Sequence, residues 1–592
     1  MQFEDAFHEA GTFGKAQKWI LFTSIIIHCF SGWPFMVPFL NSDEVEFTCV
    51  TEKISEPPIL DRKISPSSTT NVSSVKTHDV SDQKEVQEDK SKGHDKELTS
   101  SFFTVLYPRE PKIATTEPVI PDENAPQCCG TKKYKKEPSN SILSSFDFDC
   151  EPYADVFKIL VKYAFLVGFI LSCFFTGIFA DLLGRKTLLI PSILFSLCCS
   201  IGLIFAPKIK IYILCQILFG FFQYPMLSQS LLLSIESCTP KHAARIAVTL
   251  VTFSTCGFLG AALSSAYIPS WKNQVLVMIG LQSLILVLVF LKVYESARWL
   301  FYIGDHKNAE SLLRSIASVN GKTAGRIQLT GRPHNLGTQY KEDMFQGDED
   351  ELISDEELEL DSASMLDSKT VKVHTTSGNC FRLCGTFRTT MLIIFNMLAW
   401  VSCFFPMFHF AVIYQTAIES RIKFIVFLSL IKLSSWYISL VINAVGRKYP
   451  LLALTFVAML LHVFLTFMQP HLLPFSIWFL AVFGLEFTFS AQNILVIYSC
   501  EILPTQFRST GLGFFVGFSQ ISIWGIPLLS IYGYQMDAML TIAITIGLTL
   551  ASILLGFIFG LETVKNYMPQ TIDQFYQMSK SQRKPKTDLD RA

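Results

Sequence analysis

The chain has 592 residues, half of them hydrophobic, and its formal net charge of −1 shows no strong excess of either sign. It contains 52 phenylalanines, and only 17% of its residues are charged. This composition argues against a soluble enzyme and indicates a membrane protein. The net charge near zero says little about partners, and no nucleic-acid partner is expected.

Twelve apolar stretches are each long enough to cross a hydrocarbon layer about 30 Å thick as a helix. The first six lie at 18–40, 159–180, 187–206, 211–233, 247–268 and 274–293, and the second six at 389–413, 422–442, 449–468, 473–499, 511–532 and 538–560. They predict an all-α polytopic membrane protein with two six-helix halves, 18–293 and 389–560.

A long polar segment, 41–158, separates the first two spans and is expected to be an extracellular loop. Asn71 begins an Asn-Val-Ser sequon there, which makes it a candidate glycosylation site. Four cysteines of this segment are candidates for two disulfides in any of three pairings: Cys49, Cys128, Cys129 and Cys150. The vicinal pair is not expected to bond to itself.

The segment 294–388 connects the halves and is expected to lie in the cytoplasm. It opens with a helical pattern from Asn308 to Val319 and then becomes strongly acidic. Eleven of the twenty residues from Glu342 to Asp361 are Asp or Glu, which predicts disorder and a segment able to bind a cytosolic partner.

Basic residues in the short connections predict the orientation of the chain. They follow the even-numbered spans or precede the first one: Lys15, Lys18, Arg185, Lys186, Lys241, Arg245, Arg447, Lys448 and Arg508. The segments 1–17 and 561–592 are therefore expected to be cytoplasmic, in a protein of the plasma membrane.

Two opposite charges lie near the centres of otherwise apolar spans. Lys432 is in the eighth span and Glu486 is in the tenth. A charge at mid-bilayer depth costs at least about 2.5 kcal/mol, so such residues usually face a protein interior or a wet cavity. We expect these two residues to be important for function.

The two halves repeat each other in sequence. Gly177–Lys186, with the sequence GIFADLLGRK, has a partial echo in Asn443–Lys448, with the sequence NAVGRK. Gly184 and Gly446 are 262 residues apart, and Glu236 and Glu501 are 265 apart. A parallel duplication of a six-helix unit explains both spacings.

The segment Gly177–Lys186 resembles the loop signature of the major facilitator superfamily. Further segments are similar to the organic cation and anion transporters of that superfamily, the solute carrier 22 family: Gly11–Gly14, Phe146–Cys150, Glu295–Leu300, Asn308–Ala309, Ala317–Gly321, and Glu501–Thr505 with Arg508. The resemblance covers the transmembrane body. It implies a major facilitator fold in which two halves rock about a site at the membrane midplane.

Charged residues at the cytoplasmic ends of the helices are expected to act as a gate. Asp181 and Arg185 are the first candidates, because ion pairs at this level can hold the inner side closed while the site faces outward. The further candidates are Glu236, Arg245, Glu295, Arg298, Arg447, Glu501 and Arg508. The alternative is that the cationic members only fix topology and reach lipid headgroups.

Three positions depart from the family pattern. Lys432 stands where the family usually has an acidic residue, Leu485 stands where a basic residue is usual, and Gln520 is neutral at a position that is acidic in cation carriers and basic in anion carriers. Three interpretations of Lys432 and Glu486 are open. They form an ion pair of swapped polarity, or Lys432 binds an anionic substrate, or Lys432 is an accidental residue that faces water.

The expected function is secondary or facilitative transport of a small organic solute, either an anion or a neutral or zwitterionic molecule, by alternating access. The candidate substrate-binding residues are Lys432, Glu486, Gln520, Asn493, Gln223, Tyr224, Phe405 and Trp436. No catalytic, metal or cofactor motif is found, so we expect neither an enzyme nor an ATP-driven pump. The alternatives are an organic cation or carnitine-like carrier and a non-transporting membrane scaffold or receptor.

Overall fold

The structure is a computed structural model of the whole chain. It describes residues 3–11, 13–42, 47–50, 131–134, 140–146, 154–322, 329, 383–416, 420–468, 471–531, 538–564 and 568–581. The sequon at Asn71 and the acidic segment around Glu342–Asp361 lie outside these residues, as do Cys128, Cys129 and Cys150. Cys49 is described only as part of a strand.

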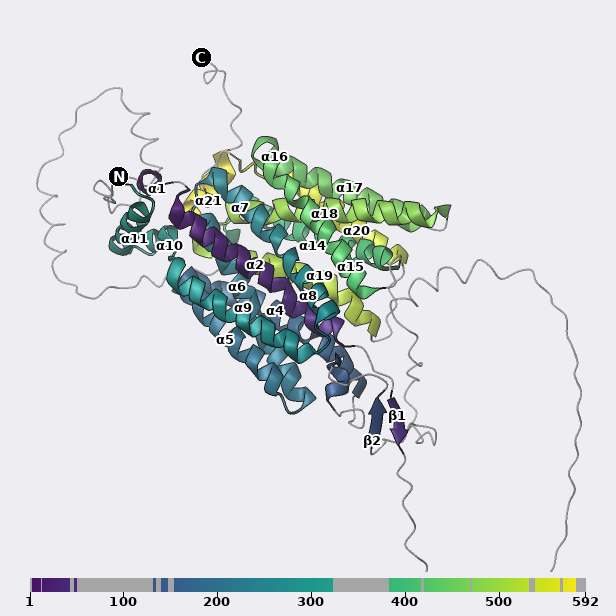
Figure 1. The fold of residues 1–592 in the computed structure, drawn as a ribbon. Coiled ribbons are helices and arrows are strands. Elements are labelled where there is room, and N and C mark those ends of the chain that lie inside the picture. Colours follow the sequence, from purple (N-terminus) through teal and green to yellow (C-terminus); the bar gives the residue numbers. More distant parts are fainter. Residues whose placement is uncertain are drawn as a thin grey trace, which may run out of the picture. The chain divides into compact units, whose positions relative to one another are not determined.

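The first six spans form long helices in the expected order (Figure 1). They are α2 (Lys15–Leu40), α4 (Ala154–Leu183), α5 (Arg185–Phe205), α6 (Ile209–Glu236), α7 (Pro240–Phe253) with α8 (Thr255–Tyr267), and α9 (Trp271–Lys292). Helices satisfy every backbone donor and acceptor internally, which is why apolar segments adopt them in a bilayer.

The second set follows the same pattern. Its helices are α14 (Phe387–Thr416), α15 (Arg421–Ser434) with η4 (Ser435–Tyr437) and α16 (Ile438–Val445), α17 (Lys448–Met468), α18 (Pro474–Ile502), α19 (Arg508–Ile531) and α20 (Ala538–Phe559). Within the described residues, eleven segments are long and apolar enough to cross a membrane, and α19 is the remaining long helix of the expected twelve.

The fifth and eighth spans are interrupted, which the sequence pattern did not predict. Ser254 separates α7 from α8, and its hydroxyl donates to the Val251 carbonyl at 2.7 Å. In the eighth span, the Ser435 hydroxyl donates to the Lys432 carbonyl at 2.7 Å where the α-helix tightens into η4. Serine hydroxyls that bond to the preceding turn bend helices, and here they do so in two spans that contact each other.

The two halves meet along two seams. On one side α4 packs against α19, and on the other α8 packs against α15 while α7 packs against α16 and α18. The peripheral helices α5 and α17 contact mainly helices of their own half. Any site shared by the halves is therefore expected at these two seams or between them.

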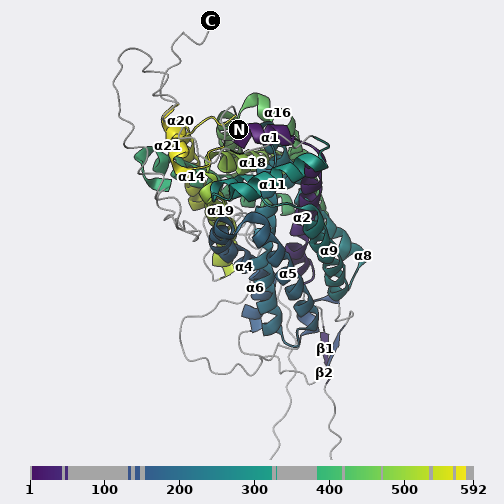
Figure 2. The ribbon, with the colours of Figure 1, turned by 90° about the vertical axis from the view of Figure 1, so that its left-hand side faces the viewer.

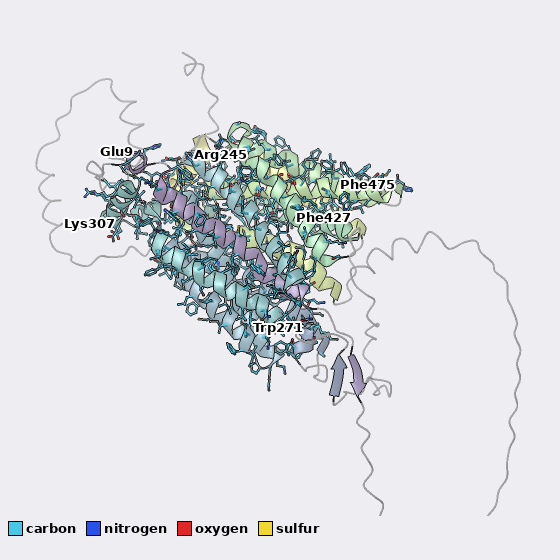
Figure 3. All side chains as sticks on the ribbon, viewed as in Figure 1. Glu9, Arg245, Trp271, Lys307, Phe427 and Phe475 are labelled. Carbon is cyan, nitrogen blue, oxygen red and sulfur yellow. The ribbon has the colours of Figure 1, made fainter. Side chains whose placement is uncertain are left out.

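Short helices gather at one end of the bundle, which we call the terminal face (Figures 1 and 2). They are α1 (Phe3–Ala10), α10 (Ala297–Tyr302), α11 (His306–Val319) and α21 (Ile572–Ser581). Glu9 lies at this end and Trp271 at the opposite one (Figure 3). Helix α11 matches the helical pattern expected from Asn308.

The long segment after the first span contains a small two-stranded sheet. Strand β1 (Phe47–Val50) pairs antiparallel with β2 (Thr131–Tyr134), with Cys49 opposite Lys132. The sheet belongs to a separate unit, Val45–Glu137. The turn of η2 (Leu143–Ser145) belongs to the membrane unit, where Trp271 donates to the Ser145 hydroxyl at 3.0 Å.

Candidate functional site: an ionic seam at the terminal face and a partly buried lysine between the halves

Glu236, the last residue of α6, lies at the centre of a buried ionic cluster. Its carboxylate is 2.8 Å from Arg508 Nη1 and 3.5 Å from Arg185 Nε, and all three side chains are fully buried. Ser296 donates a further hydrogen bond to Glu236 Oε2. Because Arg508 begins α19, the pair Glu236–Arg508 joins the two halves. We call Asp181, Arg185, Glu236 and Arg508 the Glu236 cluster.

Asp181 also joins the halves, through the first turn of α19. Its carboxylate accepts from the backbone N–H groups of Ser509 at 3.2 Å and Thr510 at 2.8 Å, and from the Thr510 hydroxyl at 2.7 Å. It also pairs with Arg185 at 3.2 Å. A carboxylate at a helix N-terminus is stabilised by the free N–H groups and the helix dipole.

The second half contains a copy of this arrangement. Arg447 contacts Glu501 at 3.1 Å and donates to the Asn443 side chain at 3.2 Å, while Thr563 donates to Glu501 as Ser296 does to Glu236. We call Asn443, Arg447, Glu501 and Thr563 the Glu501 cluster. All its members belong to the second half, so this copy does not join the halves.

Glu295 caps a helix in the structure, although it was expected to be a gate residue. It accepts from the backbone N–H groups of Arg185 and Lys186 at the start of α5. Glu562 does the same for Arg447 and Lys448 at the start of α17. The preceding residues, Gly184 and Gly446, have φ of +106° and +100°, a conformation that favours glycine.

The remaining gate candidates differ in position. Arg298 is buried, donates to the Glu236 carbonyl at 3.2 Å and lies 5.1 Å from the Phe7 ring centre. Arg245 is exposed on α7 and makes no ion pair with the residues that the structure describes (Figure 3). Among the described residues, therefore, no ion pair makes Arg245 part of a gate.

Lys432 projects toward the interface between the halves. Its ammonium lies 6.0 Å from the ring centre of Phe258 on α8 and 5.7 Å from that of Phe489 on α18. Within the described residues it makes neither an ion pair nor a hydrogen bond. The lysine thus presents a charge between two aromatic rings, one from each half.

Glu486 does not pair with Lys432. Its carboxylate accepts from Ser434 at 2.6 Å and from Ser490 at 3.5 Å. Ser434 is two residues after Lys432, which places the two about 200° apart around the helix axis. The Lys432 side chain therefore leaves α15 on a different side from the one that Glu486 of α18 contacts. The ion pair of swapped polarity is not formed in this structure.

Asn493 and Trp436 make hydrogen bonds across the interface between the halves. Asn493 on α18 donates to Thr252 of α7 at 3.2 Å and to Ser435 of η4 at 2.9 Å. Trp436 donates to Thr249 of α7 at 3.1 Å. These contacts lie beside the interruptions of the fifth and eighth spans, and they give both residues a structural role at the seam.

The other four candidates are not brought together by contacts among the described residues. Gln223 and Tyr224 are buried in α6, Phe405 is buried in α14, and Gln520 is partly exposed on α19. Neither amide atom of Gln223 has a hydrogen-bond partner among the described residues. A buried amide without hydrogen bonds costs free energy, so Gln223 remains a candidate for contact with a solute.

Sequence reasoning missed several residues that contact these candidates in the structure. Phe258 and Phe489 carry no signal of their own, because phenylalanine is frequent throughout the spans. Glu562 and Thr563 did carry one: they occupy, in the second half, the places that Glu295 and Ser296 occupy in the first, 267 residues earlier. The internal repeat would have identified both residues.

The comparisons with known proteins agree with this architecture. A family model described as "Sugar (and other) transporter" matches residues 121–572. The chain belongs to this family. It is a family of transporters and not of enzymes. The resemblance noted in the sequence is thereby confirmed at the level of the family.

Relatives and solved structures extend the family assignment. Human organic anion transporter 3 is 25% identical over 468 residues, covering 76% of this chain and 77% of that protein. Mouse solute carrier family 22 member 3 is 24% identical over 493 residues, covering 79% of each. The structure of the proton:xylose symporter XylE, a major facilitator protein, matches with a TM-score of 0.55 at 12% identity, covering 95% of this chain and 98% of that one. The predicted major facilitator fold is confirmed.

Proposed function

We propose that this transporter moves small organic anions, or zwitterions with an exposed acidic group, across the plasma membrane by alternating access. Lys432 carries the proposal, because its ammonium makes no ion pair or hydrogen bond with the described residues and lies between rings from both halves. The relative named organic anion transporter 3 supports an anionic substrate. The basic residues of the short connections support cytoplasmic termini.

In the proposed complex, the substrate anion pairs with the Lys432 ammonium and its apolar body lies against Phe258 and Phe489. An unpaired charge in a membrane is costly, so an anion that neutralises it gains binding energy. Phe258 moves with the first half and Phe489 with the second. Bound substrate therefore favours the state in which both halves close on it.

The contacts at the terminal face support an alternating mechanism. Glu236–Arg508 and Asp181 with the start of α19 both join the halves at this end, so the terminal face is closed here. Release of substrate on this side requires these contacts to break. Their combined free energy must be offset by substrate binding or by new contacts at the other end.

Uptake measurements test the role of Lys432. Cells expressing the chain are given a mixed pool of organic anions, cations and zwitterions, and uptake is measured by mass spectrometry. We expect anion uptake to fall at least tenfold in Lys432→Ala, which corresponds to a loss of at least 1.4 kcal/mol of binding energy. Lys432→Arg keeps the charge and is expected to retain part of the uptake.

Glu486→Gln serves as the control for a charge in the membrane. Because Glu486 lies on another side of α15, its substitution is expected to leave anion uptake within twofold of the unchanged protein at equal surface expression. Equal losses in both variants would contradict a specific role of Lys432. Uptake of cations alone would favour a cation carrier, and no uptake of any solute would favour a scaffold.

The proposed gate role of Asp181 is tested by hydrogen exchange. Asp181→Asn weakens the acceptor for the backbone N–H groups of Ser509 and Thr510, so these amides are expected to exchange at least threefold faster in the purified protein. Asn443→Ala changes the matching position of the Glu501 cluster and is expected to leave them unchanged. Unaltered exchange in Asp181→Asn would show that Asp181 does not hold the halves together.

A further inference from the structure

We infer that His28 takes up a proton when a substrate anion binds beside Lys432, so that the anion and the proton cross the membrane together. The inference rests on the proposed function, because it requires an anion at Lys432. It adds to that site a second residue, on the first membrane helix, and a coupling ion. Neither has a part in the mechanism described so far.

His28 lies near the middle of α2 and is only 3% exposed. Its Nδ1 atom is 3.1 Å from the Ser24 carbonyl oxygen, one turn earlier in the helix, and 3.4 Å from the Ser230 hydroxyl of α6. A carbonyl oxygen only accepts hydrogen bonds, so Nδ1 carries the proton of the neutral ring and donates it. The other nitrogen, Nε2, therefore has the free lone pair.

The Nε2 atom of His28 makes no hydrogen bond with the described residues. The ring is nevertheless held in place, because Ser24 and Ser230 belong to a network that joins α2 to α6. The Ser24 hydroxyl donates to the Ser230 carbonyl at 3.2 Å and accepts from the Ser234 hydroxyl at 2.8 Å. The structure thus fixes an imidazole whose proton-accepting nitrogen is unused.

His28 lies beside the aromatic ring that Lys432 contacts. Gly32 follows His28 by one turn of α2, and a Cβ atom added to it would lie 2.7 Å from the ring of Phe258 on α8. The Lys432 ammonium is 6.0 Å from the centre of the same ring, and its charge acts directly on His28. An anion that pairs with Lys432 therefore acts on the imidazole as well.

Lys432 is the charged group that acts on His28 among the described residues. The helices that pack against α2 are α4, α6, α7, α8, α9 and α11, and their described residues add no further charge. Glu236 of α6 is held by its two arginines. The thiols of Cys29 on α2 and Cys256 on α8 hydrogen-bond to each other, and thiols are ordinarily uncharged at neutral pH.

These charges make binding of the anion and of the proton favour each other. Without substrate, a proton on His28 would place a second positive charge next to Lys432 in a region of low dielectric constant, which is unfavourable. An anion at Lys432 removes this repulsion. By linkage, the proton then raises the affinity for the anion by the same factor. The proton is taken from the solution on one side and released with the anion on the other.

Transport by the full-length protein in phosphatidylcholine liposomes tests the coupling. The probe is radiolabelled naphthalene sulfonate, or the sulfonate or sulfate of the mixed pool that is taken up fastest. Such anions stay ionised, so permeation of a neutral acid does not imitate coupling. With about pH 6 outside and about pH 7.5 inside, a range in which histidine titrates, we expect uptake at least threefold faster than at about pH 7.5 on both sides. A dye inside is expected to report acidification during uptake at equal pH.

His28→Gln and His28→Asn cannot take up a proton, so both are expected to lose the stimulation and the acidification. Asparagine keeps a donor near the place of Nδ1 and so retains the bond to Ser24. Uptake at equal pH is expected to stay within threefold of the unchanged protein, because Lys432 still binds the anion. His462→Gln on α17 also removes a buried histidine, whose ring packs against Phe410, and is expected to keep the stimulation.

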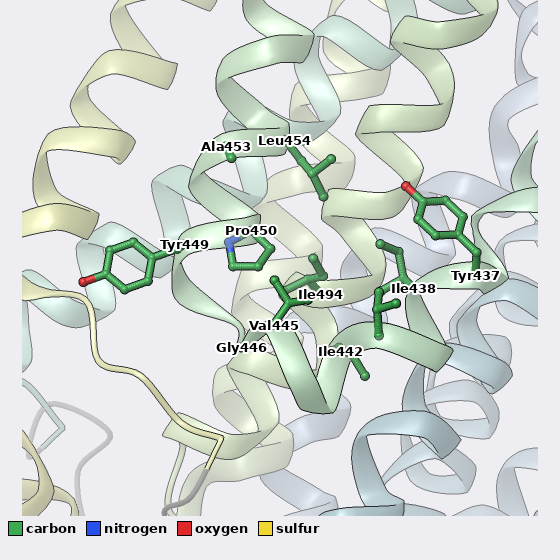
Figure 4. A pocket seen from close by; sticks show the side chains of 11 residues that line it. Tyr437, Ile438, Ile442, Val445, Gly446, Tyr449, Pro450, Ala453, Leu454 and Ile494 are labelled. Carbon is green, nitrogen blue, oxygen red and sulfur yellow. The ribbon is translucent and has the colours of Figure 1, made fainter.

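A cavity of about 460 Å³ in the second half supplies another control (Figure 4). Residues of α16 and α17 form most of its lining, and neither His28 nor Lys432 is among the lining residues. Ala453→Leu places a larger side chain in this cavity. It is expected to leave the stimulation by the gradient unchanged, because the coupling site lies elsewhere.

The outcomes separate the inference from the proposed function. Uptake that depends on Lys432 but not on the gradient, or stimulation that persists in both His28 variants, would overturn the inference alone. Loss of all uptake in both variants, with a single symmetric peak in gel filtration, would also overturn it, because His28 would then be needed for more than coupling. If no anion is taken up, or if Lys432→Ala has no effect, the proposed function and the inference fall together.

Discussion

Glu236→Ala is expected to lower the thermal stability of the purified protein strongly. The substitution leaves two fully buried guanidinium groups, those of Arg185 and Arg508, without their shared carboxylate. Removing one partner of a buried ion pair costs about 3–5 kcal/mol, because the remaining charge stays desolvated. The effect also reaches the interface between the halves, since Arg508 belongs to the second half. The apparent melting temperature is measured in detergent from the amount of monodisperse protein that remains as the temperature rises.

Glu310→Ala provides the matched control. Glu310 pairs with Arg314 on the surface of α11, where the two side chains are 24% and 46% exposed. An exposed pair at this spacing contributes about 0.3–0.5 kcal/mol, so its loss is expected to leave the melting temperature nearly unchanged. If both variants melt at the same temperature, the Glu236 cluster does not stabilise the fold in the way its burial indicates.

Gly168→Ala is expected to separate two helices of the first half and reduce the yield of folded protein. A Cβ atom at Gly168 of α4 would lie 1.8 Å from the Ile217 carbonyl oxygen of α6, and one at Gly220 of α6 would lie 1.9 Å from the Phe165 carbonyl oxygen. Small residues allow this close approach of membrane helices. The obstruction is backbone, so no side-chain rotation relieves it. The cost is about 1–3 kcal/mol or more.

Gly280→Ala is the control for the loss of a glycine from a helix. A Cβ atom there meets no other atom within 4 Å, and alanine favours helix by about 0.5–1 kcal/mol over glycine. We therefore expect this variant to be as stable as the unchanged protein or slightly more so. Fluorescence-detected gel filtration of both variants at rising temperature compares them. Similar profiles would show that α4 and α6 tolerate a wider spacing.

The architecture was largely predictable from the sequence because the bilayer imposes a minimum length on each helix. All twelve expected spans overlap helices, and their ends differ by seven residues at most. The interruptions at Ser254 and Ser435 were not predicted, because they depend on hydroxyl groups that bond to the preceding turn and leave hydropathy unchanged. The two-stranded sheet of β1 and β2 was also missed. Its strands have four residues each and lie about eighty residues apart in the chain.

The candidate site was predictable in part. The ionic residues of the terminal face were found because they recur in both halves and because their charges are unusual next to apolar spans. The relation of Lys432 to Glu486 was not predictable, since hydropathy does not determine how a helix is rotated. Two residues along α15, from Lys432 to Ser434, are enough to separate the side that faces Phe258 of the other half from the side that contacts Glu486.

The Glu236 cluster also has a consequence for the synthesis of the chain. Glu236 and Arg185 enter the membrane together with the first half, whereas Arg508 follows Glu236 by 272 residues. At roughly 5–20 residues per second, the second arginine arrives about 15–50 s later. During this time the first half is in the membrane without α19. Arg185 is then the guanidinium partner of Glu236, and the surface of α4 that later packs against α19 is uncovered. A membrane chaperone that protects this surface would have to act within that interval.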